Sequence, residues 1–147
     1  MDDNEFFESL YATLTAWGMQ RMGPGNTKLV EFEEMRQSFL EQRDRIESVQ
    51  KKTLFDIAWE DVQITAEKCW EIICSLRVGI GRVKLVAGSK ALQHLIPDLI
   101  PPIDRQYSLQ FFYGNKNLNQ RTEGGKFNEI FSCYHQVASE LRVLIET

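Results

Sequence analysis

The sequence predicts an all-α fold, a single compact domain of about six or seven helices that spans residues 1–147. Three observations predict it. Apolar residues recur at helical spacing in several long segments, strand-like stretches are few and short, and no repeat, low-complexity tract or linker divides the chain. A length of 147 residues suits one domain, and 43% hydrophobic with 26% charged residues is close to the globular average.

The N-terminal half contains three predicted helices. The first begins at a cap, with Asp2, Asp3 and Asn4 as candidates, and its apolar stripe is Phe6, Phe7, Leu10, Leu14 and Trp17. A turn at 23–26 follows, and the second helix spans 31–44. The polar stretch 44–52 fits either a continuing helix or an exposed connection. The third helix, 59–76, has a broad apolar face that is typical of a central helix.

The C-terminal half contains three more. A short helix spans 89–95 and ends before Pro97, and a second, capped by Asp104, runs to Phe112. After a polar loop at 115–126, the last helix covers 127–145. Its predicted buried stripe is Ile130, Phe131, Tyr134, Val137, Ala138, Leu141 and Leu144. We expect the side chains of Trp70, Phe131 and Leu141 to be nearly buried in one core.

Cysteine usage and the N-terminal residues predict a cytoplasmic protein without a membrane span, disulfide or metal. The first five residues are acidic rather than basic, and no apolar run approaches the length of a spanning helix. The three cysteines, Cys69, Cys74 and Cys133, are an odd number without a CxxC pair. Together with His135 they lack the spacing of known zinc sites, so we expect no metal and no other cofactor.

Charge is distributed unevenly along the chain. Residues 1–75 hold eight basic and fifteen acidic side chains, a net of −7, whereas residues 76–147 hold nine and six, a net of +3. The basic excess is concentrated between residues 77 and 126 and includes Arg82 and Lys84. It predicts a surface for DNA, while the acidic N-terminal half is the alternative site for a protein partner.

The segment from Val86 to Phe112 contains the best candidates for a functional site. Gly88 permits a tight turn, and a helix that begins at Ser89 would present free N–H groups to a phosphate. Lys90 would then lie in the first helical turn, where the helix dipole disfavours a cation. This mismatch indicates a role for Lys90 other than helix stability.

These residues resemble the helix-hairpin-helix superfamily of base-excision DNA glycosylases. Gly88-Ser89-Lys90 is similar to the end of the hairpin and its lysine, and Pro102-Ile103-Asp104 is similar to the aspartate motif, although Val86 replaces the first hairpin glycine. The pattern from Ser89 to Arg105 also resembles a bacterial family without an assigned activity. The glycosylase resemblance implies that Lys90 forms a Schiff base with the sugar, while Asp104 stabilises positive charge.

Further residues would complete such a site. The resemblance implies that hairpin amides at Gly88 and Ser89 hold a phosphate. Arg82 and Lys84 of the basic stretch, the guanidinium of Arg105 and the imidazole of His94 are further candidates to contact nucleic acid. An extruded base needs an apolar pocket, for which aromatic wall candidates are Tyr107, Phe111 and Trp17.

Each of these assignments has an alternative. Gly79-Ile80-Gly81 matches the hairpin in a second register, with Lys84 one residue late. An aspartate placed like Asp104 is more often a helix cap, Lys90 is more often a solvated lysine, and Arg105 can pair with a nearby carboxylate. Three functions follow from the sequence: a nucleic-acid-binding or accessory protein, a DNA glycosylase or lyase, and a non-catalytic protein-interaction scaffold.

Overall fold

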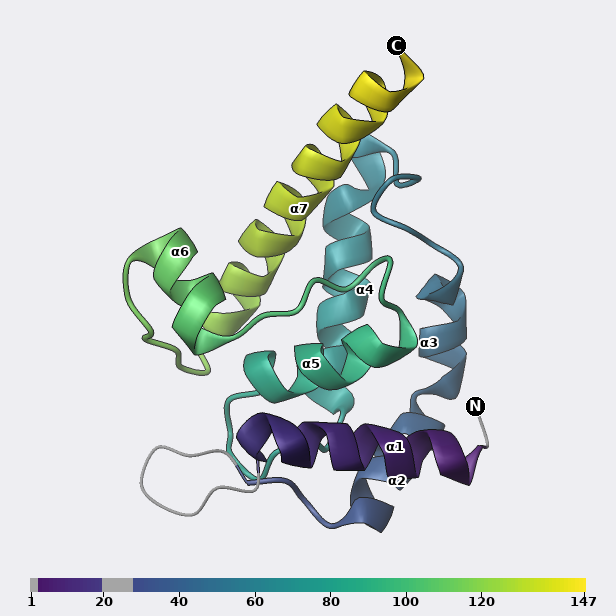
Figure 1. Ribbon diagram of the computed structural model, residues 1–147, viewed down its shortest axis with the longest axis vertical. Coiled ribbons are helices and arrows are strands. Elements are labelled where there is room, and N and C mark those ends of the chain that lie inside the picture. Colours follow the sequence, from purple (N-terminus) through teal and green to yellow (C-terminus); the bar gives the residue numbers. More distant parts are fainter. Residues whose placement is uncertain (1–2, 20–27) are drawn as a thin grey trace.

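The computed structural model describes residues 3–19 and 28–147, and this part of the chain is all helical (Figure 1). Its seven α-helices confirm the predicted fold class. They are α1 (Asn4–Leu14), α2 (Phe32–Glu41), α3 (Arg43–Gln50), α4 (Val62–Ser75), α5 (Leu85–Leu95), α6 (Gln110–Tyr113) and α7 (Glu123–Glu146). Three short helical turns accompany them: η1 (Thr15–Met19), η2 (Trp59–Asp61) and η3 (Arg105–Leu109).

Helix α4 lies at the centre, packed against α3, α5 and α7 (Figure 1). Its predicted broad apolar face is the reason, because Cys69, Ile72 and Ile73 are at most 1% exposed. Helix α1 packs across α5 and contributes Phe7 and Leu14 to the same continuous core. The side chain of Asp3 caps α1 by accepting a hydrogen bond from the Glu5 amide at 2.9 Å. Asp2 and the predicted turn at 23–26 lie outside the described residues.

The predicted helix 31–44 is divided in two. It ends at Glu41, and Gln42, with a φ of −97° and a ψ of 9°, separates α2 from α3. The polar stretch that follows is helical up to Gln50 because Ile46 and Val49, one turn apart, are fully buried. Neither of the two strand-like segments, residues 28–30 and 83–86, forms a strand. The first contributes only an isolated bridge from Leu29 to Gly79, and the second leads into α5.

Helices α5 and α7 both begin four residues before their predicted starts, at Leu85 and Glu123. One contact explains the first difference. The Glu123 carboxylate, 4% exposed, accepts hydrogen bonds from the amides of Lys84 and Leu85 at 2.8 and 3.2 Å. The first residue of α7 therefore satisfies the free N–H groups at the start of α5. Glu123 lies 39 positions after Lys84 and 38 positions after Leu85 in the sequence.

Two glycines allow close packing against α4. A Cβ at Gly88 of α5 would lie 2.7 Å from the Ile73 methyl carbon, and one at Gly124 of α7 would lie 2.8 Å from Trp70 Nε1. A side chain at either position would require the contacted residue of α4 to shift. The predicted hairpin turn at Gly88 is therefore wrong: this glycine lies inside a helix, where it permits close approach.

The C-terminal end of α7 projects beyond the other helices (Figure 1). Its predicted stripe is buried only in part. Phe131 is fully buried as expected and Trp70 is half-buried, but Leu141 is 47% exposed, so its predicted burial is wrong. The spacing of apolar residues continues along α7 after the core has ended. Within the described residues, no helix is both long and apolar enough to cross a membrane.

Candidate functional site

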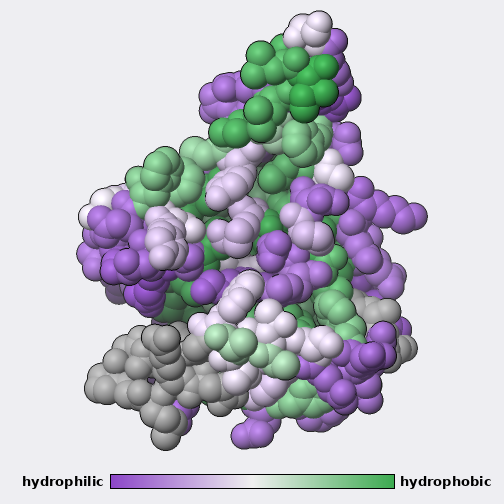
Figure 2. Space-filling model, viewed as in Figure 1, coloured by the Kyte–Doolittle hydropathy of each residue, from purple (hydrophilic) through white to green (hydrophobic). Residues whose placement is uncertain are grey.

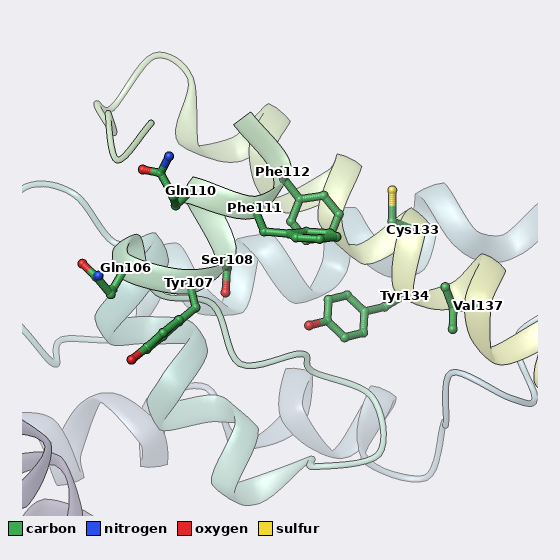
Figure 3. A pocket seen from close by; sticks show the side chains of 9 residues that line it. All are labelled: Gln106, Tyr107, Ser108, Gln110, Phe111, Phe112, Cys133, Tyr134 and Val137. Carbon is green, nitrogen blue, oxygen red and sulfur yellow. The ribbon is translucent and has the colours of Figure 1, made fainter. Parts of the chain in front are cut away.

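An open groove of about 680 Å³ lies between the η3–α6 segment and α7 (Figure 3). It is lined by Gln106, Tyr107, Ser108, Gln110, Phe111, Phe112, Cys133, Tyr134 and Val137. None of these residues is an Asp, Glu, Lys, Arg or His, and five have aromatic or aliphatic side chains. The ring of Tyr134 reaches from α7 toward η3 (Figure 3). The groove is therefore suited to an apolar ligand with few polar contacts.

Asp104 positions one wall of this groove. Its side chain accepts hydrogen bonds from the amides of Tyr107 at 2.6 Å and Ser108 at 3.3 Å, which caps η3. Ile103, fully buried, anchors the segment just before the cap. Gly114 ends α6 at a φ of 70°, a left-handed conformation that favours glycine. The cap presents the rings of Tyr107 and Phe111 outward, at 75% and 83% exposure.

The second wall continues into a longer apolar surface. From Val137, which lines the groove, this surface continues along α7 to Leu141 and Leu144, and the three side chains are 55%, 47% and 71% exposed. The apolar residues gather on the projecting end of α7 in Figure 2. A contiguous apolar surface of this kind on a folded chain marks a place of contact with another molecule.

The structure does not join the proposed catalytic pair. Within the described residues, no hydrogen bond or ion pair connects Lys90 with Asp104, and neither lines the groove. Lys90 lies in the middle of α5, with its Nζ 5.6 Å from the centre of the Trp17 ring. Asp104 acts as the helix cap described above. The three aromatic residues predicted to form the wall of one base pocket are also separated. Tyr107 and Phe111 line the groove, whereas Trp17 lies beside Lys90.

The proposed phosphate site at the start of α5 is filled by the chain itself. Ser89 is fully buried within the helix, and the true N-terminus of α5 holds the Glu123 carboxylate. In the second register, Gly79-Ile80-Gly81 lies in the connection between α4 and α5, where the Ile80 amide donates to the Lys28 carbonyl. Lys84 ends this connection as the N-cap residue of α5, with its amide engaged by Glu123.

His94 joins Trp17 and Lys90 in a small cluster on α5 and η1. Its ring centre is 5.2 Å from that of Trp17, and burial lowers the pKa of the imidazole below its usual value. The Nε2 atom is buried and has no hydrogen-bond partner among the described residues. A neutral imidazole is thus favoured, which makes His94 a poor contact for phosphate.

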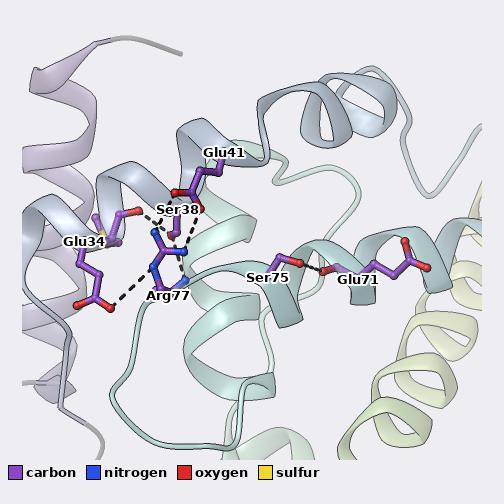
Figure 4. A network of polar contacts seen from close by, with 7 residues as sticks. Glu34, Ser38, Glu41, Glu71, Ser75 and Arg77 are labelled. Atoms are coloured by element: carbon purple, nitrogen blue, oxygen red, sulfur yellow. Dashed lines mark hydrogen bonds and ion pairs between the residues drawn. The ribbon is translucent and has the colours of Figure 1, made fainter.

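The predicted basic face is partly neutralised. Arg77 donates hydrogen bonds to the Glu41 carboxylate at 2.9 and 3.3 Å and lies 3.8 Å from Glu34 (Figure 4). The hydrogen bond from Arg77 lowers the pKa of Glu41. By contrast, the side chain of Arg105 donates to the backbone carbonyl of Lys116 at 3.1 Å. Neither the Arg105 guanidinium nor the Lys116 ammonium has a carboxylate partner in the described part of the chain. Arg82 is exposed.

The cysteines do not form a metal site or a disulfide. Cys69, Cys74 and Cys133 are free, and the described residues contain no group of His, Cys, Asp and Glu that could hold a metal ion. Burial raises the pKa of the Cys69 thiol to about 12 and that of Cys74 to about 11. Cys133 is exposed and lines the groove, where it can serve as a native reporter.

Comparisons of the chain with protein-family models, with curated proteins and with solved structures found no match.

Proposed function

We propose that the chain is a non-catalytic protein-interaction module that receives an apolar helical segment in the groove between η3–α6 and α7. The observation that supports this proposal best is the continuity of the uncharged groove with the exposed stripe of Val137, Leu141 and Leu144. The scaffold function predicted from the sequence instead places the protein partner on the acidic N-terminal half.

The chemistry of the groove favours a helix over other ligands. An amphipathic helix docks by placing side chains spaced three and four residues apart into an apolar groove. Aromatic side chains such as Tyr107 and Phe111 supply large contact areas at small entropic cost. A small polar metabolite would leave most of this surface in water, because the groove offers only a few uncharged polar groups to orient it.

The proposal is tested with a designed amphipathic helix as the probe, with leucine at its a and d positions and lysine or glutamine elsewhere. Cys133 is labelled with an environment-sensitive thiol dye in the Cys74→Ser variant, since Cys69 is buried. At nanomolar protein concentration, we expect the designed helix to bind saturably. The emission of the dye should shift to the blue because the bound helix excludes water from the groove.

Two substitutions of exposed apolar residues provide the control. Phe111→Ser removes a groove wall and should weaken probe binding about tenfold or more. Ile80→Ser changes a side chain that is 65% exposed outside the groove and should leave binding unchanged. The absence of saturable binding, or equal effects of both substitutions, would reject the proposed function.

Nucleic-acid binding is the second candidate, and one observation favours it. The exposed rings of Tyr107 and Phe111 follow closely after Arg105 along η3 and α6, and exposed aromatic rings beside cations can stack on single-stranded bases. If so, affinity for single-stranded DNA should fall steeply with added salt, and combined neutralisation of Arg105 and Lys116 should flatten that slope. No binding at low salt would exclude this candidate, and the glycosylase hypothesis with it.

A further inference from the structure

Helix α7 carries a single heptad pattern along two different environments. Its apolar residues alternate at intervals of three and four: Phe127, Ile130, Tyr134, Val137, Leu141 and Leu144. The first two are fully buried in the domain core, whereas the last four are 37%, 55%, 47% and 71% exposed. The exposed part therefore has the spacing of a coiled-coil seam but no second helix within the described chain.

This exposed part is complementary to itself. If two copies of α7 lie antiparallel about a two-fold axis at the level of Ser139, Tyr134 faces Leu144 of the second copy and Val137 faces Leu141. Every exposed seam residue then contacts another seam residue, which is the requirement for an isologous interface. We infer that the occupant of the groove is the α7 end of a second copy of this chain, an inference that rests on the proposed function.

The groove supplies the remaining contacts in this arrangement. The C-terminal end of the second α7 passes Tyr134 and reaches the mouth of the groove, where Leu144 and Ile145 are the side chains available to fill it. Both are strongly exposed in the single chain, at 71% and 80%. Phe111 and Tyr107 would cover them and lose their own exposure in return.

Charge complementarity supports the same occupant. The segment beside the groove carries Arg105 and Lys116, which have no carboxylate partner among the described residues. The approaching end of α7 carries Glu146 at the negative end of the helix dipole, and its one cation, Arg142, is engaged with Glu146 at 2.9 Å and lies 3.7 Å from Asp56. A negative helix end thus meets a basic rim, and the two-fold symmetry places this contact at both ends of the interface.

Oligomeric state tests the inference directly. Sedimentation equilibrium of the full chain should show a reversible dimer, and Val137→Glu should lower the association constant about tenfold or more. Val143→Glu is the matched control: Val143 is also exposed, at 62%, but lies about a third of a turn away from Val137 around α7. Circular dichroism should show equal helix content in both variants. A monomer at all concentrations, or equal effects of the two substitutions, would overturn the inference.

The antiparallel register has its own test. Cys133 and Thr147 of one chain are about 21 Å apart along the helix, too far for a disulfide, but lie near one another across the proposed interface. In the Cys74→Ser background, Thr147→Cys should form an interchain disulfide with native Cys133, and Cys133→Ser should abolish it. Dimers linked through Cys133 alone in the parent chain would indicate a parallel arrangement and overturn this register.

A further substitution distinguishes a second copy from an unrelated partner. The two Glu140 side chains lie beside the two-fold axis, so Glu140→Gln should strengthen the dimer about twofold by removing like-charge repulsion. If the designed helix binds at Cys133 but no dimer forms, the inference about the second copy fails while the proposed function stands. If the helix does not bind to monomeric protein, the proposed function itself fails.

Discussion

The two halves of α7 share one sequence pattern but differ in environment. In the first half, Phe127, Ile130 and Phe131 are fully buried against the core. In the second half, Val137, Leu141 and Leu144 continue the same spacing and are about half or more exposed. The difference shows that apolar periodicity indicates which side of a helix seeks an apolar contact. It does not indicate whether the chain itself supplies that contact.

The largest expected effect comes from truncating one apolar side chain in each half. Phe131→Ala should lower the free energy of unfolding by about 3–5 kcal/mol, because it leaves a cavity in a closely packed core. Leu141→Ala, at a site that is 47% exposed, should cost less than about 1 kcal/mol in the monomer. Urea unfolding at low protein concentration measures both. Similar losses would contradict the contrast between the halves.

The buried carboxylate at the start of α7 should give the next largest effect. Glu123→Ala leaves the amides of Lys84 and Leu85 buried without a partner, which should cost about 1.5–3 kcal/mol. Glu123→Gln keeps an acceptor oxygen at the same position and should recover part of the loss. If the alanine variant were as stable as the parent, the Glu123 cap would contribute nothing to holding α5 and α7 together.

Neighbouring glycines sharpen the contrast within the buried half. Gly124→Ala places a Cβ 2.8 Å from Trp70 Nε1 and should destabilise the fold by about 1–3 kcal/mol. Gly125→Ala meets nothing within 4 Å and should stabilise it by about 0.5–1 kcal/mol, since alanine favours a helix. Thermal melts of the two variants should therefore shift in opposite directions, and equal shifts would show that α7 does not lie this close to α4.

The smallest effect concerns the groove wall beside the exposed half. Asp104→Ala removes the cap of η3 and should cost about 1 kcal/mol, while Asp104→Asn keeps a capping oxygen and should be nearly neutral. Both melting temperature and probe binding at Cys133 should follow this order. Schiff-base trapping on DNA by the parent, lost in Lys90→Ala, would instead restore the enzymatic interpretation.

Local sequence signals predicted most of the helices. The caps at Asp3 and Asp104 were predicted because a side chain and an amide two to four residues away decide them. The starts of α5 and α7 could not be found in this way. They depend on Glu123, which lies far from Lys84 in the sequence and meets it only in the folded chain.

The candidate site likewise combines residues that the sequence singles out with residues that only the fold brings to it. Tyr107 and Phe111 are expected as walls of a base pocket beside Lys90 and Asp104, but the groove that they line contains neither of those residues. The opposite wall, with Tyr134 and Val137, was predicted to be core. Lys90 and Asp104 were proposed as a pair from motif spacing, but spacing along the chain does not fix a distance in space, and the fold gives them separate partners.

The sequence by itself determined an all-α chain, its caps and the apolar side of each helix, because these follow from backbone hydrogen bonding and side-chain spacing over a few residues. Only the tertiary structure decided how far the core extends. Glycines at 88 and 124 let α5 and α7 close on α4, and burial ends where α7 passes beyond its neighbours. The groove exists because contacts between distant segments determine which apolar surface is left uncovered.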